Sequence, residues 1–370
     1  MFEDILSNYD FITDIKSISP YGNGRINRTY LIDANEKFVL QKINSDIFKN
    51  VEGLMKNVEL VTDHIREKIN NENSDRKTLN LIKTNDGSSF VQANDGYYRI
   101  SEFIENGTSI DKTNDLNLLK EAGRAYGQFQ YDLRDFDANK LSITIPNFHN
   151  TLSRFYNLGD AIEKCTDLER MEKADNLIQK AMDNSKYANA IVSNMNNGNL
   201  PKRVVHNDTK LNNVVFNKDS GRVMAVLDLD TVMPDTLLYD YGDAIRSACN
   251  NAGEEERNLD NVTFNLNKYK AFTSGYLDVM KDELTVEEKV LMPISPLVMT
   301  YELGLRFLTD YLEGDCYFKV KNEDDNLNRA GVQFSLLDSM EKSLNQMTEF
   351  YDNCLLEKEN EKEYSKQKEN

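Results

Sequence analysis

The sequence predicts an α+β fold with a small, antiparallel, β-rich N-terminal lobe that contains one helix, and a larger, mainly helical C-terminal lobe with a central hairpin. Three observations predict it. Turn signals and β-forming runs fill the first hundred residues, helical periodicity dominates after residue 105, and two short apolar runs interrupt the helices near residue 215. We expect the N-terminal lobe over residues 1–104, the C-terminal lobe over 105–356 and a polar tail over 357–370.

The first lobe is defined by strands and turns. Residues 37–44 form a run of apolar and β-forming residues, which predicts a strand. Within residues 79–103, Asp-Gly pairs at 86–87 and 95–96 are hairpin signals, because both residue types tolerate positive φ. They predict a three-stranded antiparallel meander. Between these β sections, residues 48–69 carry apolar side chains at helical spacing and predict the inserted helix.

The second lobe is defined by helical segments. The clearest are Asp115–Phe129, Thr151–Met182, Phe264–Met280 and Thr285–Tyr311. An apolar stripe within the last of these extends to residue 312, and Gly314 just beyond it favours a helix end. Two apolar runs, Asn213–Asn217 and Arg222–Leu229, flank Asp219-Ser-Gly221 and predict the central hairpin.

Composition excludes several classes of protein. The chain has 370 residues, with 44 Lys and Arg against 62 Asp and Glu, a formal charge of −18. No stretch approaches the ~18 consecutive apolar residues of a membrane span, and the start, MFEDILSNYD, has no signal-peptide pattern. Nucleic acids and anionic membranes are polyanions, which an acidic chain does not attract. We therefore expect a cytoplasmic protein, assumed monomeric, with no nucleic-acid or membrane partner.

Cysteine and histidine spacing predicts neither a disulfide framework nor a transition-metal site. The four cysteines are far apart and form no CxxC pair, and the three histidines lack metal-ligand spacing.

The segment Val204–Asp230 carries the residues best suited to chemistry. Asp208 lies five residues before Asn213, and Asp228 ends the second run of the hairpin. This is the H-x-D-x-x-x-x-N spacing, followed by a metal-binding Asp, of the protein-kinase-like superfamily. Phosphoryl transfer from ATP requires divalent cations, and Mg²⁺ takes oxygen ligands. We therefore expect Asn213 and Asp228 to bind Mg²⁺, and Asp208 to accept the proton of the attacking hydroxyl.

Beyond this spacing, the chain resembles the aminoglycoside-phosphotransferase and choline-kinase-like branch of the kinase fold, and within it the N-acetylhexosamine 1-kinases. The matching segments are YGNGRINRTYLI (Tyr21–Ile32), FVLQKIN (Phe38–Asn44), HNDTKLNNVVF (His206–Phe216), VLDLDTVMP (Val226–Pro234), YDYGDAIRS (Tyr239–Ser247), RFLTDYLEGDCYFKV (Arg306–Val320) and NLNRAGVQFSLLDSME (Asn326–Glu341). The Arg306–Val320 block points to the hexosamine subgroup. The resemblance implies a bilobal, protein-kinase-like fold that uses ATP and Mg²⁺ to phosphorylate the anomeric hydroxyl of GlcNAc or GalNAc, with preference between the two left open.

The resemblance also implies nucleotide-binding residues. A strand-turn-strand over the phosphates, where small residues let backbone N–H groups approach an anion, would comprise Gly22, Gly24, Arg25, Ile26 and Asn27. A hinge that meets adenine through backbone groups would include Ser101 and Phe103.

The resemblance further implies a basic residue on the third strand, in contact with the α- and β-phosphates. Alternation places Phe38, Leu40 and Lys42 on one face of that strand and Gln41 on the other. Lys42 is the candidate, with Gln41 as the alternative occupant and a solvated lysine as the ordinary explanation. The acidic helix partner would be either Glu52 or Glu59.

The substrate candidates are Asp230, Arg306 and Tyr317. Asp230 follows the metal aspartate by two residues, so in a regular strand both would point to the same side, where a carboxylate can accept hydrogen bonds from sugar hydroxyls. Arg306 lies in line with Glu302 and Asp310 at i,i+4 spacing, for which a surface ion-pair row is the alternative. Tyr317 belongs to the same block.

Three further residues are expected to support the catalytic loop. Asp240 and Asp243 should brace it by hydrogen bonds, and His206 should orient it rather than act as the base.

Two other functions stay open. One is a kinase of another small alcohol, such as an aminoglycoside or a choline-like compound, since cationic acceptors suit an acidic surface. The other is a non-catalytic nucleotide-binding scaffold.

Overall fold

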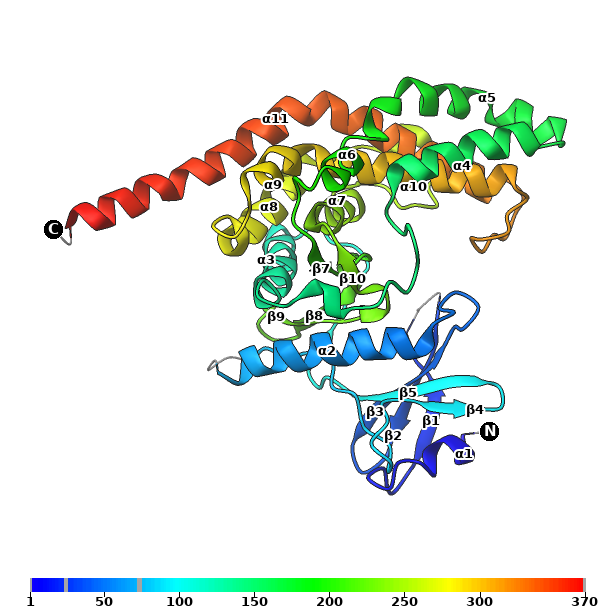
Figure 1. The fold of residues 1–370 in the computed structure, drawn as a ribbon, viewed down its shortest axis with the longest axis vertical. Coiled ribbons are helices and arrows are strands. Elements are labelled where there is room, and N and C mark those ends of the chain that lie inside the picture. Colours follow the sequence, from blue (N-terminus) through cyan, green and yellow to red (C-terminus); the bar gives the residue numbers. More distant parts are fainter. Residues whose placement is uncertain (1, 23–25, 72–74, 369–370) are drawn as a thin grey trace. The chain divides into compact units, whose positions relative to one another are not determined.

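The chain forms two compact units, which the computed structural model describes over residues 2–22, 26–71 and 75–368 (Figure 1). Unit 1 comprises residues 1–109, 132–146 and 213–234. Unit 2 comprises residues 110–131, 147–212 and 235–370. The predicted central hairpin therefore belongs to the same unit as the N-terminal strands.

A five-stranded antiparallel sheet makes up much of unit 1, in the order β1-β2-β3-β5-β4. Its strands are β1 (Ser17–Pro20), β2 (Arg28–Asp33), β3 (Lys37–Ile43), β4 (Val91–Ala93) and β5 (Gly96–Glu102). Phe38 and Leu40 of β3 and Tyr98 and Ile100 of β5 are buried together on one face, in a core that also includes residues of the first turn, α1 (Glu3–Leu6). The alternation predicted for β3 is therefore confirmed.

The predicted meander is correct in its second turn and wrong in its first strand. β4 pairs with residues 96–98 across the Asp95-Gly96 turn, as expected. Residues 79–83 form no strand, and Leu81 makes only an isolated bridge to Ser101. Residues 79–83 therefore lie beside the end of β5, past residues 96–98 that pair with β4, and they do not pair with β4.

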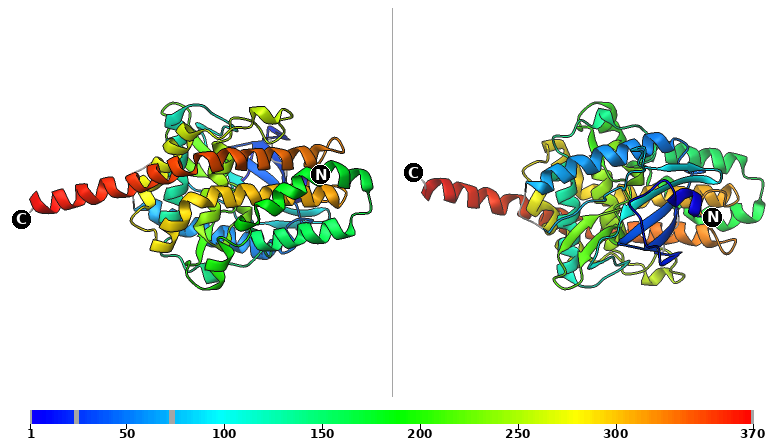
Figure 2. Two further views of the ribbon diagram at one scale, coloured as in Figure 1. Left: turned by 90° about the horizontal axis from the view of Figure 1, so that it is seen from above. Right: turned by 90° about the horizontal axis from the view of Figure 1, so that it is seen from below.

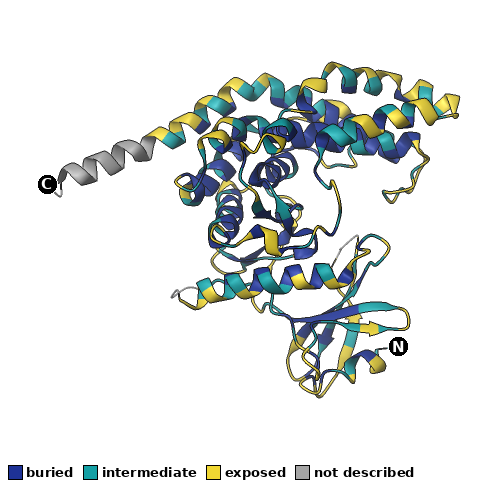
Figure 3. Ribbon diagram, viewed as in Figure 1, coloured by how far each residue is buried: buried dark blue, intermediate teal, exposed yellow. Residues whose placement is uncertain are grey.

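The inserted helix is α2 (Val51–Asn70), capped by the Asn50 side chain, which accepts the N–H of Gly53 at 2.9 Å. Its predicted apolar stripe is buried, as the colouring in Figure 3 shows along one side of the helix: Val51, Leu54, Val58, Val61 and Ile65.

A second sheet in unit 1 contains the predicted hairpin. It has the order β6-β8-β9, with β6 (Gly107–Thr108), β8 (Val214–Asn217) and β9 (Val223–Val226). The strand does not continue as far as predicted, because β9 ends two residues before Asp228. Asp228 adopts a left-handed conformation (φ +60°) and precedes a short 3₁₀ turn, η4 (Leu229–Thr231). Unit 1 also contains η1 (Ala138–Lys140).

Unit 2 is mainly helical. Its helices are α3 (Leu116–Asp132), α4 (Thr151–Lys164), α5 (Leu168–Asp183), α6 (Val192–Asn196), α7 (Leu237–Ala248), α8 (Leu266–Met280), α9 (Val286–Leu291), α10 (Ser295–Leu312) and α11 (Asp325–Lys368). Shorter elements are η2 (Ser185–Tyr187), β7 (Arg203–Val205), η5 (Leu259–Asn261) and η6 (Met292–Ile294). Two further elements, η3 (Leu211–Asn213) and β10 (Met233–Asp235), span the junctions between the units.

Two segments predicted as single helices are divided. Residues 151–182 form α4 and α5: α4 ends at Lys164, and Asp167 caps α5 by accepting the N–H groups of Glu169 and Arg170 at 3.1 Å. Residues 285–311 form α9, η6 and α10, with Pro293 and Pro296 at the breaks. The residues expected to form a polar tail continue α11 as far as Lys368.

α10 is the central helix of unit 2. It packs against α4, α5, α7 and α11, and it runs beside α11 in both views of Figure 2. All its residues are buried except Arg306 and Thr309. The close approach of α7 depends on Gly242, where a Cβ would lie 2.5 Å from the carbonyl oxygen of Ser295. In the three described ranges, no helix combines the length and apolar character needed to cross a membrane.

Candidate active site

The catalytic loop of unit 2 is held by one buried carboxylate. Asp240, on α7, accepts the N–H groups of His206 at 2.8 Å and Asn207 at 2.7 Å, and the amide of Gln130 at 2.9 Å. The hydroxyl of Thr209 donates to the carbonyl oxygen of Asp240 at 2.6 Å. Burial raises the pKa of Asp240, and the donors from the loop oppose this rise. The prediction that Asp240 braces the loop is confirmed.

His206 belongs to the catalytic loop and accepts a hydrogen bond from its backbone. The N–H of Asp208 donates to His206 Nδ1 at 3.2 Å, and the buried ring packs edge-on against Tyr126 and Phe129. This contact orients the loop, as expected for His206. The Asp208 carboxylate is half-buried and lies 2.6 Å from Lys210 Nζ. The charge of Asp208 raises the pKa of Lys210.

Asp243 has a different role from the predicted one. Its carboxylate forms a buried ion pair with Arg246 at 2.8 Å rather than a hydrogen bond to the loop backbone. Burial alone would raise its pKa, but the charges of Arg246 and Lys210 hold the pKa of Asp243 below its usual value.

The two predicted metal ligands lie together in the hairpin of unit 1. The N–H of Leu227 donates to the carbonyl oxygen of Asn213 at 2.8 Å, which places Asp228 beside Asn213. An amide oxygen and a carboxylate suit a hard cation such as Mg²⁺. Over residues 2–22, 26–71 and 75–368, no group of three or more His, Cys, Asp and Glu side chains could hold a metal. A cation here would therefore take further oxygens from the nucleotide phosphates.

Asp230 lies in a buried ion pair of unit 1. Its carboxylate is 2.5 Å from Arg99 Nη1, and the Asn27 side chain donates to its other oxygen at 2.5 Å. Both members of the pair are almost inaccessible, with 3% of Asp230 and 2% of Arg99 exposed. Because Asp228 is left-handed and η4 follows, the regular alternation assumed for Asp228 and Asp230 is wrong. Contact of Asp230 with a substrate stays a prediction.

The third strand presents Gln41, not Lys42, to this ion pair. Gln41 Oε1 accepts from Arg99 Nε at 3.0 Å and Nη2 at 2.8 Å, from the opposite position on β5. Lys42 lies on the other face of β3, paired with Asp95 at 2.6 Å and above the Tyr98 ring. The arrangement favours Gln41 as the occupant of the slot predicted for Lys42.

Arg99 is a residue that sequence reasoning missed. Arg99, on β5, contacts Met55 of α2, whose sulfur lies 3.8 Å from Arg99 Nη1. Within the described residues, neither candidate acid of that helix pairs with a base of β3: Glu59 pairs with Lys83, and Glu52 is exposed in the first turn. The one available signal was an arginine inside an apolar strand, which needs a buried carboxylate partner.

The predicted nucleotide-binding residues of unit 1 are only partly described. Gly24 and Arg25 lie outside the described residues. Gly22 has φ +72°, a conformation that favours glycine, and Ile26 is exposed. The Asn27 side chain donates to the Asp230 carboxylate, and its amide oxygen accepts the backbone N–H of residue 44 at 3.0 Å.

The predicted hinge continues β5. Ser101 is buried, and the N–H of Phe103 donates to the carbonyl oxygen of Lys37 at 3.1 Å. That N–H is therefore used within the sheet, and the adenine contact of the hinge stays a prediction.

Arg306 of unit 2 faces aromatic rings. Its guanidinium carbon lies 5.4 Å from the ring centroid of Phe148, 5.9 Å from Tyr317 and 5.6 Å from Phe318. The surface ion-pair row proposed as an alternative is wrong, because Glu302 and Asp310 are buried and bonded elsewhere.

A loop held by Asp310 positions two of these rings. The Asp310 carboxylate accepts the backbone N–H of Tyr317 at 2.7 Å, that of Phe318 at 2.9 Å, and the amide of Asn326 at 2.8 Å. These bonds fix the segment between α10 and α11 where it passes Arg306.

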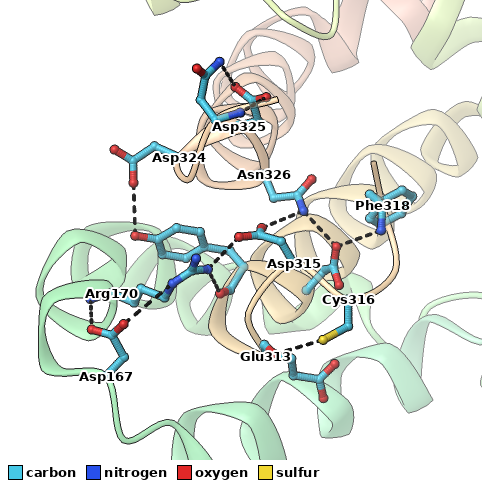
Figure 4. Close-up of polar contacts among 12 residues, drawn as sticks. Asp167, Arg170, Glu313, Asp315, Cys316, Phe318, Asp324, Asp325 and Asn326 are labelled. Carbon is cyan, nitrogen blue, oxygen red and sulfur yellow. Dashed lines mark hydrogen bonds and ion pairs between the residues drawn. The ribbon is translucent and has the colours of Figure 1, made fainter. Parts of the chain in front are cut away.

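The same loop is secured from α5. Figure 4 shows Asp315 between Arg170 and Asn326, at 2.8 Å and 2.9 Å. Asp315 has φ +61°, and the guanidinium of Arg170 also lies 4.7 Å from the Tyr311 ring centroid. The Asp315 carboxylate therefore has two partners within the protein.

A second arginine lies close to Arg306. Arg154 donates to the backbone carbonyls of Asn147 at 3.0 Å and Phe148 at 2.9 Å, while its buried Nε has no partner. Burial, and then the charge of Arg306, lower the pKa of Arg154. In the described part of the chain, neither guanidinium forms an ion pair or hydrogen bond with a carboxylate.

The chain thus combines an antiparallel sheet and a helical unit with a loop that carries Asp208 and a hairpin that carries Asn213 and Asp228. The model of the phosphotransferase enzyme family (APH) matches residues 17–261, more than half of the chain. The chain belongs to this family.

Solved structures agree in fold. The aminoglycoside phosphotransferase of Alicyclobacillus acidocaldarius has a TM-score of 0.61 and 13% identity, covering 93% of this chain and 95% of that one. A microcompartment-associated aminopropanol kinase has a TM-score of 0.56 and 14% identity, covering 93% and 97%. An amicoumacin kinase, solved with AMP-PNP and Ca²⁺, has a TM-score of 0.53 and 13% identity, covering 90% and 96%. The predicted α+β, protein-kinase-like fold class is confirmed.

Proposed function

We propose that the chain uses ATP and Mg²⁺ to phosphorylate the anomeric 1-hydroxyl of an N-acetylhexosamine, GlcNAc or GalNAc, giving the hexosamine 1-phosphate and ADP. Membership of the phosphotransferase enzyme family supports the transfer. The similar amicoumacin kinase, solved with a nucleotide analogue and a divalent cation, supports the choice of cofactors.

Each part of the loop and hairpin has a role in this reaction. Asp208 would accept the proton of the attacking hydroxyl, from a backbone that Asp240 holds in place. Asn213 and Asp228 would hold Mg²⁺, which when bound neutralises charge on the phosphate oxygens. The protein's contribution is therefore mainly positioning and electrostatics.

The surroundings of Arg306 support the acceptor class. Within the described residues, neither its guanidinium nor that of Arg154 beside it forms a hydrogen bond or ion pair with a carboxylate, although the charge of Arg306 lowers the pKa of Glu302. Hydroxyl and amide oxygens of a neutral sugar can accept from such donors, and the exposed Tyr317 ring offers a flat apolar surface to a sugar ring. An ammonium group would be repelled there. Arg154, Arg306 and Tyr317 thus favour a neutral acceptor over an aminoglycoside or a choline-like compound.

The test measures ADP release with Mg-ATP on GlcNAc, GalNAc, glucose, galactose, choline and kanamycin, followed by phosphorus NMR of the product. An anomeric phosphate from the N-acetylhexosamines, without turnover of choline or kanamycin, supports the proposal. Turnover of the cationic acceptors alone contradicts the acceptor class and leaves Asp208, Asn213 and Asp228 as the phosphotransfer residues. Loss of turnover in Asp208→Asn with nucleotide binding retained separates a catalyst from a scaffold.

A further inference from the structure

A buried histidine, for which sequence spacing indicates no role, lies beside the catalytic loop. His149 precedes α4 in unit 2, and only 5% of it is exposed. Its Nδ1 lies 2.8 Å from Glu302 Oε1, and its Nε2 lies 3.2 Å from the backbone carbonyl oxygen of Asn207. Asn207 immediately precedes Asp208 in the chain.

The two partners determine the protonation of the ring. A carbonyl oxygen can only accept, so Nε2 must carry a hydrogen to bond with Asn207. Glu302 accepts from Thr151 Oγ1 at 2.6 Å through its second oxygen, as an ionised carboxylate does. Burial alone would raise the pKa of Glu302, but His149 and Arg306 outweigh it and hold this pKa below its usual value. With Glu302 ionised, Nδ1 also donates and the ring is an imidazolium.

The residue that His149 contacts has an unusual backbone. Asn207 is left-handed, with φ +65°. Its N–H donates to Asp240 at 2.7 Å, and its carbonyl faces His149. The peptide groups on both sides of Asn207 are therefore held by buried charged groups, Asp240 on one side and His149 on the other. Asn tolerates the left-handed region better than most residues, and a left-handed non-glycine residue persists where its surroundings determine it.

We propose that His149, as an imidazolium paired with Glu302, is a positioning residue that fixes the left-handed turn before Asp208 and so directs the Asp208 carboxylate. The inference rests on the role of Asp208 in the proposed function. It adds a second support for the loop beside Asp240.

The charges around the ring determine its pH dependence. Burial lowers the pKa of His149, but Glu302 and Asp243 outweigh burial and the charge of Arg306, so the net shift is upward. The titratable and charged groups near the ring are Glu302 and Arg306 of α10, Tyr239, Asp240 and Asp243 of α7, and Asp235 before α7. Because the pKa is raised on folding, the contribution is complete below the unfolded value of about 6.5. It is lost as pH rises through the folded value.

Nitrogen NMR of the histidine rings tests the protonation directly, since the full chain has only three histidines. Because the pKa is raised, we expect the His149 ring to be mostly protonated on both nitrogens at pH 6.5, and His206 to show a bare Nδ1 because that atom accepts from Asp208. Signals are assigned with His149→Gln and His64→Gln. A mostly neutral His149 ring at pH 6.5 overturns the proposal, whatever the acceptor of the enzyme proves to be.

Kinetics test the positioning. His149→Gln keeps polarity but cannot carry charge, and we expect kcat to fall about 10–100-fold with KM for both substrates within about twofold. The alkaline fall in kcat should disappear in this variant. His64→Gln is the matched control, because His64 also pairs with a carboxylate, Asp135 of unit 1. An unchanged kcat, or a wild-type pH profile in His149→Gln, contradicts the proposal. The acceptor is the one that the substrate panel identifies, so a failed sugar assay does not affect this test. If His149→Gln does not fold, the NMR of the wild-type chain decides.

Discussion

Two charged residues one turn apart on α10, Arg306 and Asp310, have opposite surroundings. Asp310 is buried and accepts three N–H groups, two of them from the backbone of the following loop. Arg306 is half-exposed among aromatic rings and has no carboxylate partner within the described ranges. A charge with all its partners inside the protein maintains structure, whereas a charge without them is available to a ligand. Four substitutions test this distinction, from the largest expected effect to the smallest.

Arg99→Met applies the distinction to unit 1. It leaves the Asp230 carboxylate buried without its cation, and removing one member of a buried pair costs about 3–5 kcal/mol. We expect a loss of that size in the free energy of unfolding, measured by urea titration. Lys42→Met is the control, because its ion pair with Asp95 is partly exposed and should contribute under about 1 kcal/mol. Equal losses in the two variants would contradict the distinction.

Asp310→Ala removes the acceptor for three donors at once. We expect a loss of about 2–4 kcal/mol in unfolding free energy, because donors left unsatisfied retain their desolvation cost. Thr309→Ala is the neighbouring control, since the Thr309 hydroxyl has no hydrogen-bond partner. A loss below about 1 kcal/mol in Asp310→Ala would show that the loop is held by other contacts.

Arg306→Gln should act on turnover rather than on stability. We expect kcat/KM for the acceptor to fall about 10–100-fold, equivalent to about 1.4–2.7 kcal/mol, while unfolding free energy changes by less than about 0.5 kcal/mol. Steady-state kinetics and urea titration on the same preparation measure both. The distinction between the two α10 residues fails if Arg306→Gln destabilises as strongly as Asp310→Ala.

Asp235→Asn tests a carboxylate that burial disfavours. Burial raises the pKa of Asp235 to about 6, against an N–H donor from Thr236. The folded state therefore binds the proton more tightly than the unfolded state, and stability falls as pH rises between about 4 and 6. We expect the variant to gain about 1 kcal/mol at pH 7, less than the ~3 kcal/mol of the full shift, because the side chain is only partly buried. At pH 4 the gain should vanish in thermal unfolding, and an equal gain at both values would contradict this account.

Much of the fold followed from local signals. The stripe on α2, the hairpin of β8 and β9 and the alternation in β3 each depend on neighbouring residues, which the sequence displays directly. The breaks at Asp167 and Pro293 were also local signals, but they were overlooked in longer apolar patterns.

The candidate site was harder to predict because its partners are distant in sequence. Arg99 and Asp230 are 131 positions apart, and His149 and Glu302 are 153 apart. Periodicity identified Glu302, Arg306 and Asp310 as the polar side of α10. It could not show that other helices surround α10, so that two of the three are buried.

The hydrogen bonds from the loop to Asp310 bear on how acceptor preference can change. Asp310 binds main-chain N–H groups of residues 317 and 318, which every residue type except proline provides. The backbone path of the loop therefore depends on Asp310 and not on which side chains stand at positions 317 and 318. If these side chains contact the acceptor, as we propose, random mutagenesis confined to positions 317 and 318 samples new acceptors on an unchanged backbone.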